Sequence, residues 1–470
     1  MSLANPKPRA SLLERAAEVY DFGAALKTRR PAPAADPVSL SGVDCSHYWQ
    51  EHTATMPEAY GRTQFPTANC GYLGSQFRSA YGASSTMTGK GQTVAIIDAY
   101  ASPTLVKDYA TFARRNGGTA LTSSTYRQIV PKRVYDTALC GGIGGWQGEQ
   151  VLDVTAVHGV APKAKVLYVG GFNCGTGLDV AMSQVLDDRL ATIVSNSYGN
   201  EGEFPQAAVQ VNENQHLQAA AEGIGLYFSS GDDGDNSQLP ADEGIPAPSA
   251  DYPATSPWVT AVGGTSTEIG QDGRVALETG WGNHYDAVLK DGATGALSYK
   301  DPLPGPFSSG AGGGVSTVFA RPSYQDGIVT SAGRGVPDVA ADADPRTGEL
   351  IGLRQYDDET GRSGAYAEEI YGGTSLASPL FAAEVALVQQ RTHRVFGFLN
   401  PLAYAAALEK APVFRDVLPA DLVIAYNDQF SGLTSLVTGD QDTSLTVAAG
   451  WDQVTGLGVL KLDAIGARMR

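Results

Sequence analysis

The residues most suggestive of chemistry form a short serine motif in front of a long apolar stretch. Ser375 lies in GTSLASP (373–379), and the residues that follow, FAAEVALVQQR, have a helical pattern. We expect Ser375 in the first turn of that helix, where backbone N–H groups and the positive end of the helix dipole lie beside its Oγ. Such a place suits a nucleophile, because these groups stabilise an oxyanion on a substrate carbonyl. Serine before a helix is also a frequent N-cap, which is the alternative interpretation.

A nucleophilic serine needs a base, and carboxylates are the best candidates in this sequence. Glu149 and Asp153 are four residues apart in the predicted helix 149–160, so both side chains lie on one helical face. Two adjacent carboxylates repel each other unless one is protonated, and a solvated acidic face is the alternative. Asp232, in SGDDG (230–234), ends a predicted strand and is either a site residue or part of a turn.

The histidines offer a weaker base. The chain has six of them, at positions 47, 52, 158, 216, 284 and 393, and none follows the pattern of a histidine beside a glycine-rich helix start. His158 precedes Gly159 at the end of the predicted helix, where we expect a cation or C-cap role. A Ser-His-Asp arrangement of Ser375 with His158 and Asp98, which ends a predicted strand, is therefore the less favoured alternative.

Apolar strand-like runs alternate with helical runs from residue 91 onward. We expect strands at 91–100, 164–172, 191–199, 223–232 and 258–266, and helices at 103–115, 149–160, 176–188 and 205–222. Strands that are apolar throughout and separated by helices predict a mostly parallel sheet covered on both faces, which is an α/β fold. Ligands bind beyond the carboxyl ends of such strands. The region 283–312 is predicted as loop and hairpin, and 41–75 has no clear period.

The composition is that of an acidic globular protein. Among 470 residues, 42% are apolar and 18% charged, with 50 acidic against 33 basic side chains. This balance does not favour nucleic-acid binding, which needs a basic surface. An acidic chain loses net charge as pH falls, which fits an enzyme that works in acid without proving it. No apolar run approaches the length of a membrane span.

Four cysteines permit three disulfide pairings, and no CxxC pair suggests a zinc site. We take the two short-loop pairings, Cys45 with Cys70 and Cys140 with Cys174, as a hypothesis. Four buried free thiols are the alternative.

GTSxxxP resembles the nucleophile motif shared by subtilisins and sedolisins, and the carboxylates in place of a histidine motif favour sedolisins. VSNSYG (194–199), PATSPWVTAVGGTS (253–266), GGGVSTVFARPSYQ (312–325) and VPDVAADADP (336–345) also look like sedolisin segments. The chain is thus identified as similar to the serine-carboxyl peptidases of the kumamolisin-like sedolisin family over residues 70–470. The resemblance implies a subtilisin-like three-layer fold, with a mostly parallel central sheet flanked by helices.

The resemblance also assigns catalytic roles. It implies that Ser375 is the nucleophile, Glu149 the base, and Asp153 the residue that hydrogen-bonds and orients Glu149. Asp232 occupies the place of the family's oxyanion-hole aspartate, which must be protonated to donate a hydrogen bond. The sequence departs from the family's GDSG motif at Asp233, whose charge we expect to raise the pKa of Asp232. An endopeptidase that cuts polypeptides at acid pH is therefore expected.

A calcium site near the C-terminus is also implied by the resemblance. Asp416 and Asp452 would provide side-chain oxygens, and Val417, Ala448 and Gly450 backbone carbonyls, for one structural Ca²⁺. Such a mixed set of oxygens suits calcium. Two loop aspartates that cap turns are the alternative.

The expected organisation has three parts. Residues 1–40 hold a possible helix at 10–28 and a Pro/Ala-rich linker, a possible remnant of the inhibitory prodomain that sedolisins carry. Residues 41–75 form a cysteine-containing extension, and residues 76–470 the peptidase domain. We expect a secreted monomer whose signal peptide is outside this sequence. An inactive peptide-binding homologue and a non-enzymatic calcium-binding surface protein are the remaining alternatives.

Overall fold

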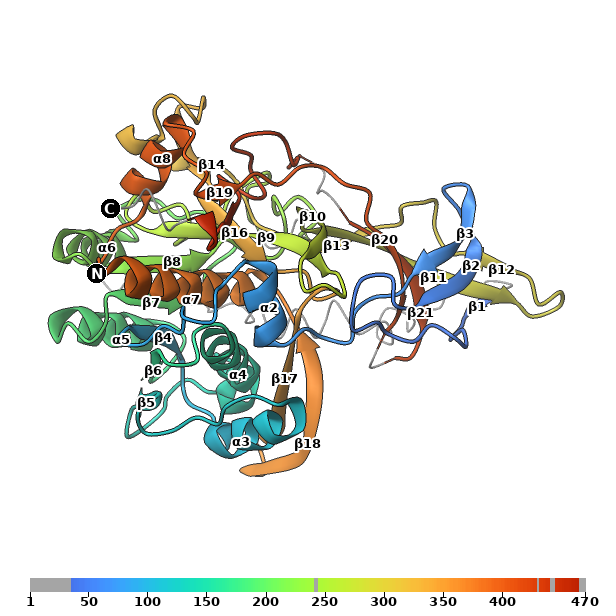
Figure 1. The fold of residues 1–470 in the computed structure, drawn as a ribbon, viewed down its shortest axis with the longest axis horizontal. Coiled ribbons are helices and arrows are strands. Elements are labelled where there is room, and N and C mark those ends of the chain that lie inside the picture. Colours follow the sequence, from blue (N-terminus) through green and yellow to red (C-terminus); the bar gives the residue numbers. More distant parts are fainter. Residues whose placement is uncertain (1–34, 241–243, 429–430, 440–443, 465–470) are drawn as a thin grey trace.

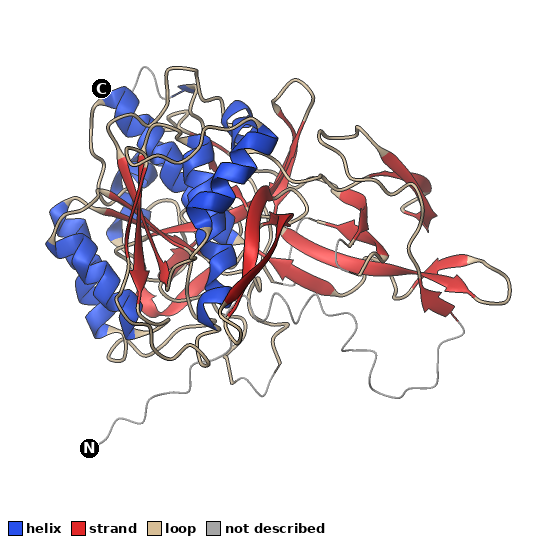
Figure 2. Cartoon of the chain, turned by 90° about the horizontal axis from the view of Figure 1, so that it is seen from below, coloured by secondary structure: helices blue, strands red, loops and turns tan. Residues whose placement is uncertain are grey.

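The computed structural model describes residues 35–240, 244–428, 431–439 and 444–464. Figure 1 shows a body of helices packed around a central sheet, from which a set of antiparallel strands projects to one side. Figure 2 shows the same division from below, with all of the described helices gathered in the body. The helix predicted at 10–28 lies outside the described residues.

The central sheet is mostly parallel, as the sequence predicts. In the described residues it has ten strands, nine of which follow one another in the order β19-β22-β16-β9-β8-β7-β4-β6-β5. Its pairings are parallel except where β10 meets β9 and β19 meets β22. The strands are β4 (Thr93–Ala99), β5 (Tyr126–Ile129), β6 (Lys165–Gly171), β7 (Ile193–Asn196), β8 (Gly225–Ser229), β9 (Thr260–Ile269), β10 (Val275–Gly280), β16 (Val339–Asp342), β19 (Phe414–Arg415) and β22 (Val459–Leu460).

Helices cover both faces of this sheet, which explains why its strands are apolar throughout. Val94 and Ile96 of β4 belong to one hydrophobic cluster, and Ala95 and Ile97 belong to another on the opposite face. The first cluster includes residues of α2 (Gly74–Ala80), α3 (Leu105–Asn116), α4 (Gly142–Val160), α7 (Thr374–Thr392) and α8 (Asn400–Leu408). The second includes residues of α5 (Thr176–Asp187) and α6 (Gln210–Glu222).

Helix α4 begins earlier than predicted because tertiary contacts support its start. It begins at Gly142 rather than at 149, through a glycine-rich segment that disfavours helix by itself. The carboxylate of Asp358 accepts hydrogen bonds from the N–H groups of Ile143 and Gly144, at 2.9 and 2.6 Å. Asp358 lies in the turn between β17 (Glu349–Asp357) and β18 (Arg362–Tyr371), a long hairpin that packs against α4. Helix α6 begins five residues later than predicted, at Gln210.

The projecting strands form what we call the β module. Three distant segments build it, and a hydrophobic cluster that includes Met56, Phe65, Val288 and Leu436 joins them. The region 283–312 is hairpin, as predicted, and the extension 41–75 contains a hairpin that its sequence pattern does not reveal. The strands of the β module are β1 (Ala35–Pro37), β2 (Thr53–Ala59), β3 (Arg62–Pro66), β11 (Gly282–Asp291), β12 (Leu297–Tyr299), β13 (Phe307–Gly310), β20 (Val423–Asn427) and β21 (Thr434–Thr438). The remaining strands, β14 (Gly314–Ala320) and β15 (Gly333–Val336), pair with each other.

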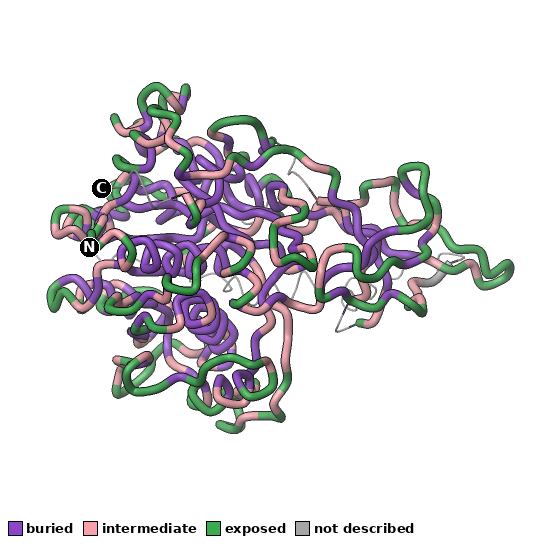
Figure 3. Tube along the Cα trace, viewed as in Figure 1, coloured by how far each residue is buried: buried purple, intermediate pink, exposed green. Residues whose placement is uncertain are grey.

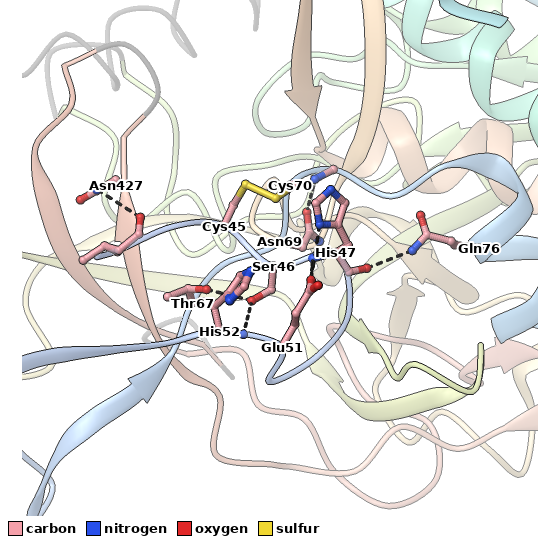
Figure 4. The surroundings of a disulfide bond; sticks show 12 residues. Cys45, Ser46, His47, Glu51, His52, Thr67, Asn69, Cys70, Gln76 and Asn427 are labelled. Carbon is pink, nitrogen blue, oxygen red and sulfur yellow. Dashed lines mark hydrogen bonds and ion pairs between the residues drawn. A yellow bond between two sulfur atoms is a disulfide. The ribbon is translucent and has the colours of Figure 1, made fainter. Parts of the chain in front are cut away.

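Both short-loop disulfides are confirmed. Cys45 is bonded to Cys70, and Cys140 to Cys174. Figure 4 shows the first bond beside Ser46, whose hydroxyl lies 2.9 Å from that of Thr67 and accepts the N–H of His52 at 3.1 Å. The disulfide therefore closes the chain on either side of the β2–β3 hairpin.

Candidate active site

Ser375 is the second residue of α7, where the sequence analysis expects it. The helix starts after Gly373, whose φ of 87° is readily available only to glycine. A Cβ at this position would also come within 2.6 Å of Asp232 Oδ2. Glycine therefore lets the loop of Asp232 approach the start of the nucleophile's helix. Figure 3 shows α7 as an almost wholly buried helix, so Ser375 is carried by a rigid element.

Glu149 reaches Ser375 from α4, which packs directly against α7. The hydroxyls of Ser375 and Ser197 lie close enough to the Glu149 carboxyl to lower its pKa. At the preceding position, a Cβ on Gly148 would lie 2.9 Å from the ring of Tyr371, so glycine allows α4 to lie close to β18. Because β18 leads straight into Ser375, this close packing sets the distance between the base and the nucleophile.

Asp153 lies one turn further along α4 and is fully buried. Its oxygens accept hydrogen bonds from the Ser197 hydroxyl, at 2.9 and 3.1 Å, and not from Glu149 as expected. The same hydroxyl lies 3.1 Å from the carbonyl oxygen of Ser375. Ser197 thus joins the acidic helix to the nucleophile's backbone. The sequence analysis did not assign this role to Ser197, although Ser197 lies in VSNSYG (194–199), which resembles a sedolisin segment.

A second missed residue is Asp98, at the carboxyl end of β4. It is fully buried, and within the described chain neither of its carboxyl oxygens has a hydrogen-bond partner. Burial raises the pKa of Asp98 to about 8. The sequence analysis proposed Asp98 only as the partner of a histidine. Its position at the carboxyl end of a parallel strand is nevertheless where the site residues of such sheets gather.

The carboxyl groups perturb one another. Burial raises the pKa of Glu149 well above its ordinary value, and the negative charges of Asp98 and Asp232 add to that rise. Burial also raises the pKa of Asp153, again with contributions from Asp98 and Glu149, while the hydrogen bond from Ser197 opposes the rise. The pKa values of Asp98, Glu149 and Asp153 are therefore all raised, and the three carboxyls titrate as one coupled group.

Asp232 approaches Ser375 from the loop that follows β8. Its Oδ1 accepts the Thr374 N–H at 2.7 Å and lies 2.9 Å from the Thr374 hydroxyl. Burial raises the pKa of Asp232, and these two bonds oppose the rise. The expectation that Asp233 raises this pKa is wrong, because the charge of Asp233 acts on Asp251 instead. A carboxyl with a raised pKa thus lies beside the helix start that holds the nucleophile.

His158 does not take part in this arrangement. It lies nine residues beyond Glu149 on α4, which corresponds to about 14 Å along the helix. Its ring is buried against Tyr109, and its Nε2 lies 3.0 Å from the carbonyl oxygen of Thr119. Burial lowers the pKa of His158, which disfavours the expected cationic role at the helix end. The Ser-His-Asp alternative has no support in this geometry.

Known peptidases are similar to this chain in sequence and in fold. The sequence profile of the subtilase family matches residues 89–418. Kumamolisin from Bacillus sp. (strain MN-32) is 30% identical over 431 residues, which cover 88% of this chain and 65% of kumamolisin. The solved structure of Pseudomonas sedolisin, a serine-carboxyl proteinase complexed with two molecules of pseudo-iodotyrostatin, is 28% identical with a TM-score of 0.62. That alignment covers 86% of this chain and 99% of the solved chain.

The chain belongs to the subtilase family, in its sedolisin branch. Sedolisin from Pseudomonas sp. (strain 101) is a further relative, 27% identical over 412 residues, which cover 85% of this chain and 61% of that protein. The chain thus spans less than two thirds of the length of these curated relatives. Its α/β fold is subtilisin-like, as the sequence predicts.

The residues expected to bind calcium in this sedolisin lie at one turn of the body. The carboxylate of Asp416 accepts the Gly450 N–H, at 3.0 and 3.2 Å, and that of Asp452 accepts the Ala448 N–H at 3.1 Å. Asp452 also accepts the N–H groups of Val454 and Thr455, so one of its roles is to cap a turn. Both carboxylates therefore lie beside the 448–450 backbone and accept its N–H groups. In the described part of the chain, no helix is long and apolar enough to cross a membrane.

Proposed function

We propose that this chain is a secreted serine-carboxyl endopeptidase that hydrolyses peptide bonds in polypeptides at acid pH. The observation that carries this proposal is the arrangement at the start of α7, where the Asp232 carboxyl accepts the Thr374 N–H and the Ser375 hydroxyl lies close enough to Glu149 to lower its pKa. Two disulfides suit an oxidising, extracellular compartment. The names of the relatives, which include a serine-carboxyl proteinase, support the same class of reaction.

In the proposed mechanism, Ser375 Oγ attacks the scissile carbonyl while Glu149 takes the hydroxyl proton. The carbonyl oxygen becomes an oxyanion that accepts hydrogen bonds from the helix start and from protonated Asp232. Glu149 then returns its proton to the leaving amine, which frees the first product and leaves an acyl-enzyme. Water attacks the acyl-enzyme with Glu149 again as the base, so that Ser375 is regenerated.

Acid pH is required on this account because of Asp232. An ionised carboxylate cannot donate a hydrogen bond, so activity falls as pH rises through the pKa of Asp232 in the folded enzyme. The base must be ionised, and in a coupled cluster the first proton to leave belongs to the group as a whole. The acid limit of activity is therefore set jointly by Asp98, Glu149 and Asp153.

The remaining parts of the proposal concern the rest of the protein. One structural Ca²⁺ would be held by Asp416 and Asp452 with the carbonyls of Val417, Ala448 and Gly450, and would fix the C-terminal turn to the body. A prodomain that keeps the peptidase inactive before secretion would be the chain's own partner, and the active protein would be a monomer.

A protease assay tests the proposal. The purified chain should cleave a denatured protein substrate at pH 4 and lose this activity near neutral pH, whereas Ser375→Ala should be inactive at every pH. Product sizes then separate internal cleavage from the release of tripeptides, which the name of a relative, the tripeptidyl-peptidase SED4 of Arthroderma otae, describes. A wild-type chain that binds peptides in acid without cutting them would instead be an inactive homologue.

A further inference from the structure

Thr374, the residue before the nucleophile, contacts one oxygen of Asp232 with two different groups. Its backbone N–H donates to Asp232 Oδ1 at 2.7 Å, and its hydroxyl lies 2.9 Å from the same oxygen. Thr374 is only 1% exposed and occupies the first position of α7. One oxygen of the Asp232 carboxyl is therefore held by protein donors.

The other oxygen, Asp232 Oδ2, lies toward Gly373. A Cβ built on Gly373 would come within 2.6 Å of Oδ2 but 3.4 Å of Oδ1. A carboxyl that donates a hydrogen bond carries its proton on one oxygen and accepts with the other. Since Oδ1 already receives the Thr374 donors, the acidic proton of Asp232 belongs on Oδ2, at the start of the nucleophile's helix.

The Thr374 hydroxyl has one proton and two acceptors within reach. It lies 3.0 Å from the carbonyl oxygen of Gly231 and 2.9 Å from Asp232 Oδ1, and it accepts the Gly231 N–H at 3.1 Å. When Asp232 is ionised, its charge draws the hydroxyl proton to Oδ1, because charged acceptors make the stronger hydrogen bond. When Asp232 is neutral, the carbonyl of Gly231 competes for that proton. The hydroxyl thus stabilises the ionised form of Asp232 more than the neutral form.

We propose that Thr374 is a positioning residue of the oxyanion site. By holding Oδ1 of Asp232, it directs the proton on Oδ2 toward the oxyanion that forms on the substrate, and it sets the pH at which that proton is lost. This inference rests on the proposed function, in which Asp232 donates to the oxyanion. Every residue type except proline supplies the N–H at this position, so the contribution specific to threonine is its hydroxyl.

The test compares Thr374→Val, which keeps the shape and removes the hydroxyl, with Thr374→Ser, which keeps the hydroxyl. Removal of an oxyanion-site donor costs about 10²–10³ in turnover, so Asp232→Ala should lower kcat/KM by that factor. Thr374→Val should lower kcat/KM by about 10-fold, a smaller loss than that of Asp232→Ala. Thr374→Ser should have a kcat/KM close to that of the wild type. The alkaline limb of kcat/KM should move to higher pH in Thr374→Val, because the bond that favours ionised Asp232 is gone.

A peptide aldehyde provides a second readout, since it forms a hemiacetal with a serine hydroxyl and places an oxygen in the oxyanion site. Its affinity for Thr374→Val should fall by about the same factor as kcat/KM, whereas the affinity of the corresponding peptide alcohol should not change. In the Asp232→Ala background, Thr374→Val should cause little further loss, because no carboxyl remains to be positioned.

Thr347→Val is the matched control. The Thr347 hydroxyl is also buried and has the same kind of partners: Asp342 Oδ1 at 2.7 Å, the carbonyl of Asp344 at 3.3 Å and the N–H of Thr267 at 3.2 Å. This substitution should lower the temperature of unfolding and leave the alkaline limb in place. The comparison therefore separates the loss of a buried hydroxyl from the loss of its effect on Asp232.

The outcomes distinguish the inference from the proposed function. If Asp232→Ala lowers kcat/KM but Thr374→Val shifts neither the alkaline limb nor aldehyde affinity, the inference is wrong and the proposed function stands. If Asp232→Ala leaves kcat/KM unchanged, the proposed oxyanion role itself is wrong. Should Thr374→Val not fold, Thr374→Ala provides the same comparison, and full additivity of its loss with Asp232→Ala would overturn the inference.

Discussion

The body and the β module bury different kinds of side chain. The body encloses carboxyl oxygens that have no hydrogen-bond partner within the described chain, among them those of Asp98, Glu349 and Glu384. The interior of the β module consists mainly of apolar residues from distant segments, with Asp286 of β11 as a buried carboxyl, and a disulfide closes the segment that carries the β2–β3 hairpin. The buried carboxyls of the body therefore lose stability as pH rises, whereas the hydrophobic cluster of the β module does not titrate.

The two regions also differ in the response of their carboxyls to pH. Burial raises the pKa of Glu384 well above its ordinary value, and the charge of Arg415 only partly offsets this. In the β module, burial also raises the pKa of Asp286, but N–H groups of Asp301 and Lys300 oppose the rise, and N–H donors of the turn after β11 lower the pKa of Asp291. A raised pKa favours the folded protein in acid and a lowered one favours it at higher pH. The body should therefore be the region that fails first as pH rises.

The largest effect expected from this contrast is on activity. Glu149→Gln should lower kcat/KM by about 10⁴-fold at the optimal pH, since it removes the base from a group of residues that act together. Glu58→Gln, an exposed change in β2 of the β module, is the control and should leave kcat/KM as it is. The measurement is cleavage of a fluorogenic peptide in acid. Equal activity of both variants would contradict the assignment of catalysis to the body.

Removal of the disulfide tests the stability of the β module. Replacement of Cys45 and Cys70 by serine opens a loop with a sequence separation of 25, which should lower the free energy of unfolding by about 3 kcal/mol. Hydrogen exchange should become faster in β2, β3 and β20, and the activity of the folded variant at low temperature should be retained. If exchange instead accelerates first in α4 and α7, the two regions are not independent in stability.

Calcium removal should act on the body. A ligand at 100 times its Kd stabilises a protein by about 2.7 kcal/mol, so a chelator should lower the temperature of thermal inactivation by several degrees. Asp452→Asn should show the lower temperature without chelator and little further response to it. If neither the chelator nor added Ca²⁺ changes the temperature of thermal inactivation, Asp416 and Asp452 only cap turns.

The smallest effect concerns pH-dependent stability. The pKa of Glu384 is raised in the folded state, so its stabilising contribution is complete below its unfolded pKa and is lost as pH rises. A single such group changes the free energy of unfolding by at most about 1.4 kcal/mol per pH unit. Glu384→Gln should therefore flatten the decline of thermal stability as pH rises above the ordinary pKa of a glutamate. An unchanged decline would show that Glu384 is not the group that titrates.

The sequence by itself determined the α/β architecture and the candidates for the reacting groups. The apolar runs at 91–100 and 164–172 predicted buried parallel strands, since both faces of such strands are covered. The motif around Ser375 predicted a serine at a helix start, and the spacing of Glu149 and Asp153 placed both on one helical face. These predictions succeeded because each depends on residues that are close together in the chain.

Only the tertiary structure decided which groups surround the serine. Asp98 lies at the end of β4, and Ser197 and Asp232 follow β7 and β8, so these residues gather only because the three strands are neighbours in the sheet. The early start of α4 depends on Asp358 from a hairpin more than 200 residues away. The raised pKa values have the same origin, because they depend on burial by segments from the whole chain.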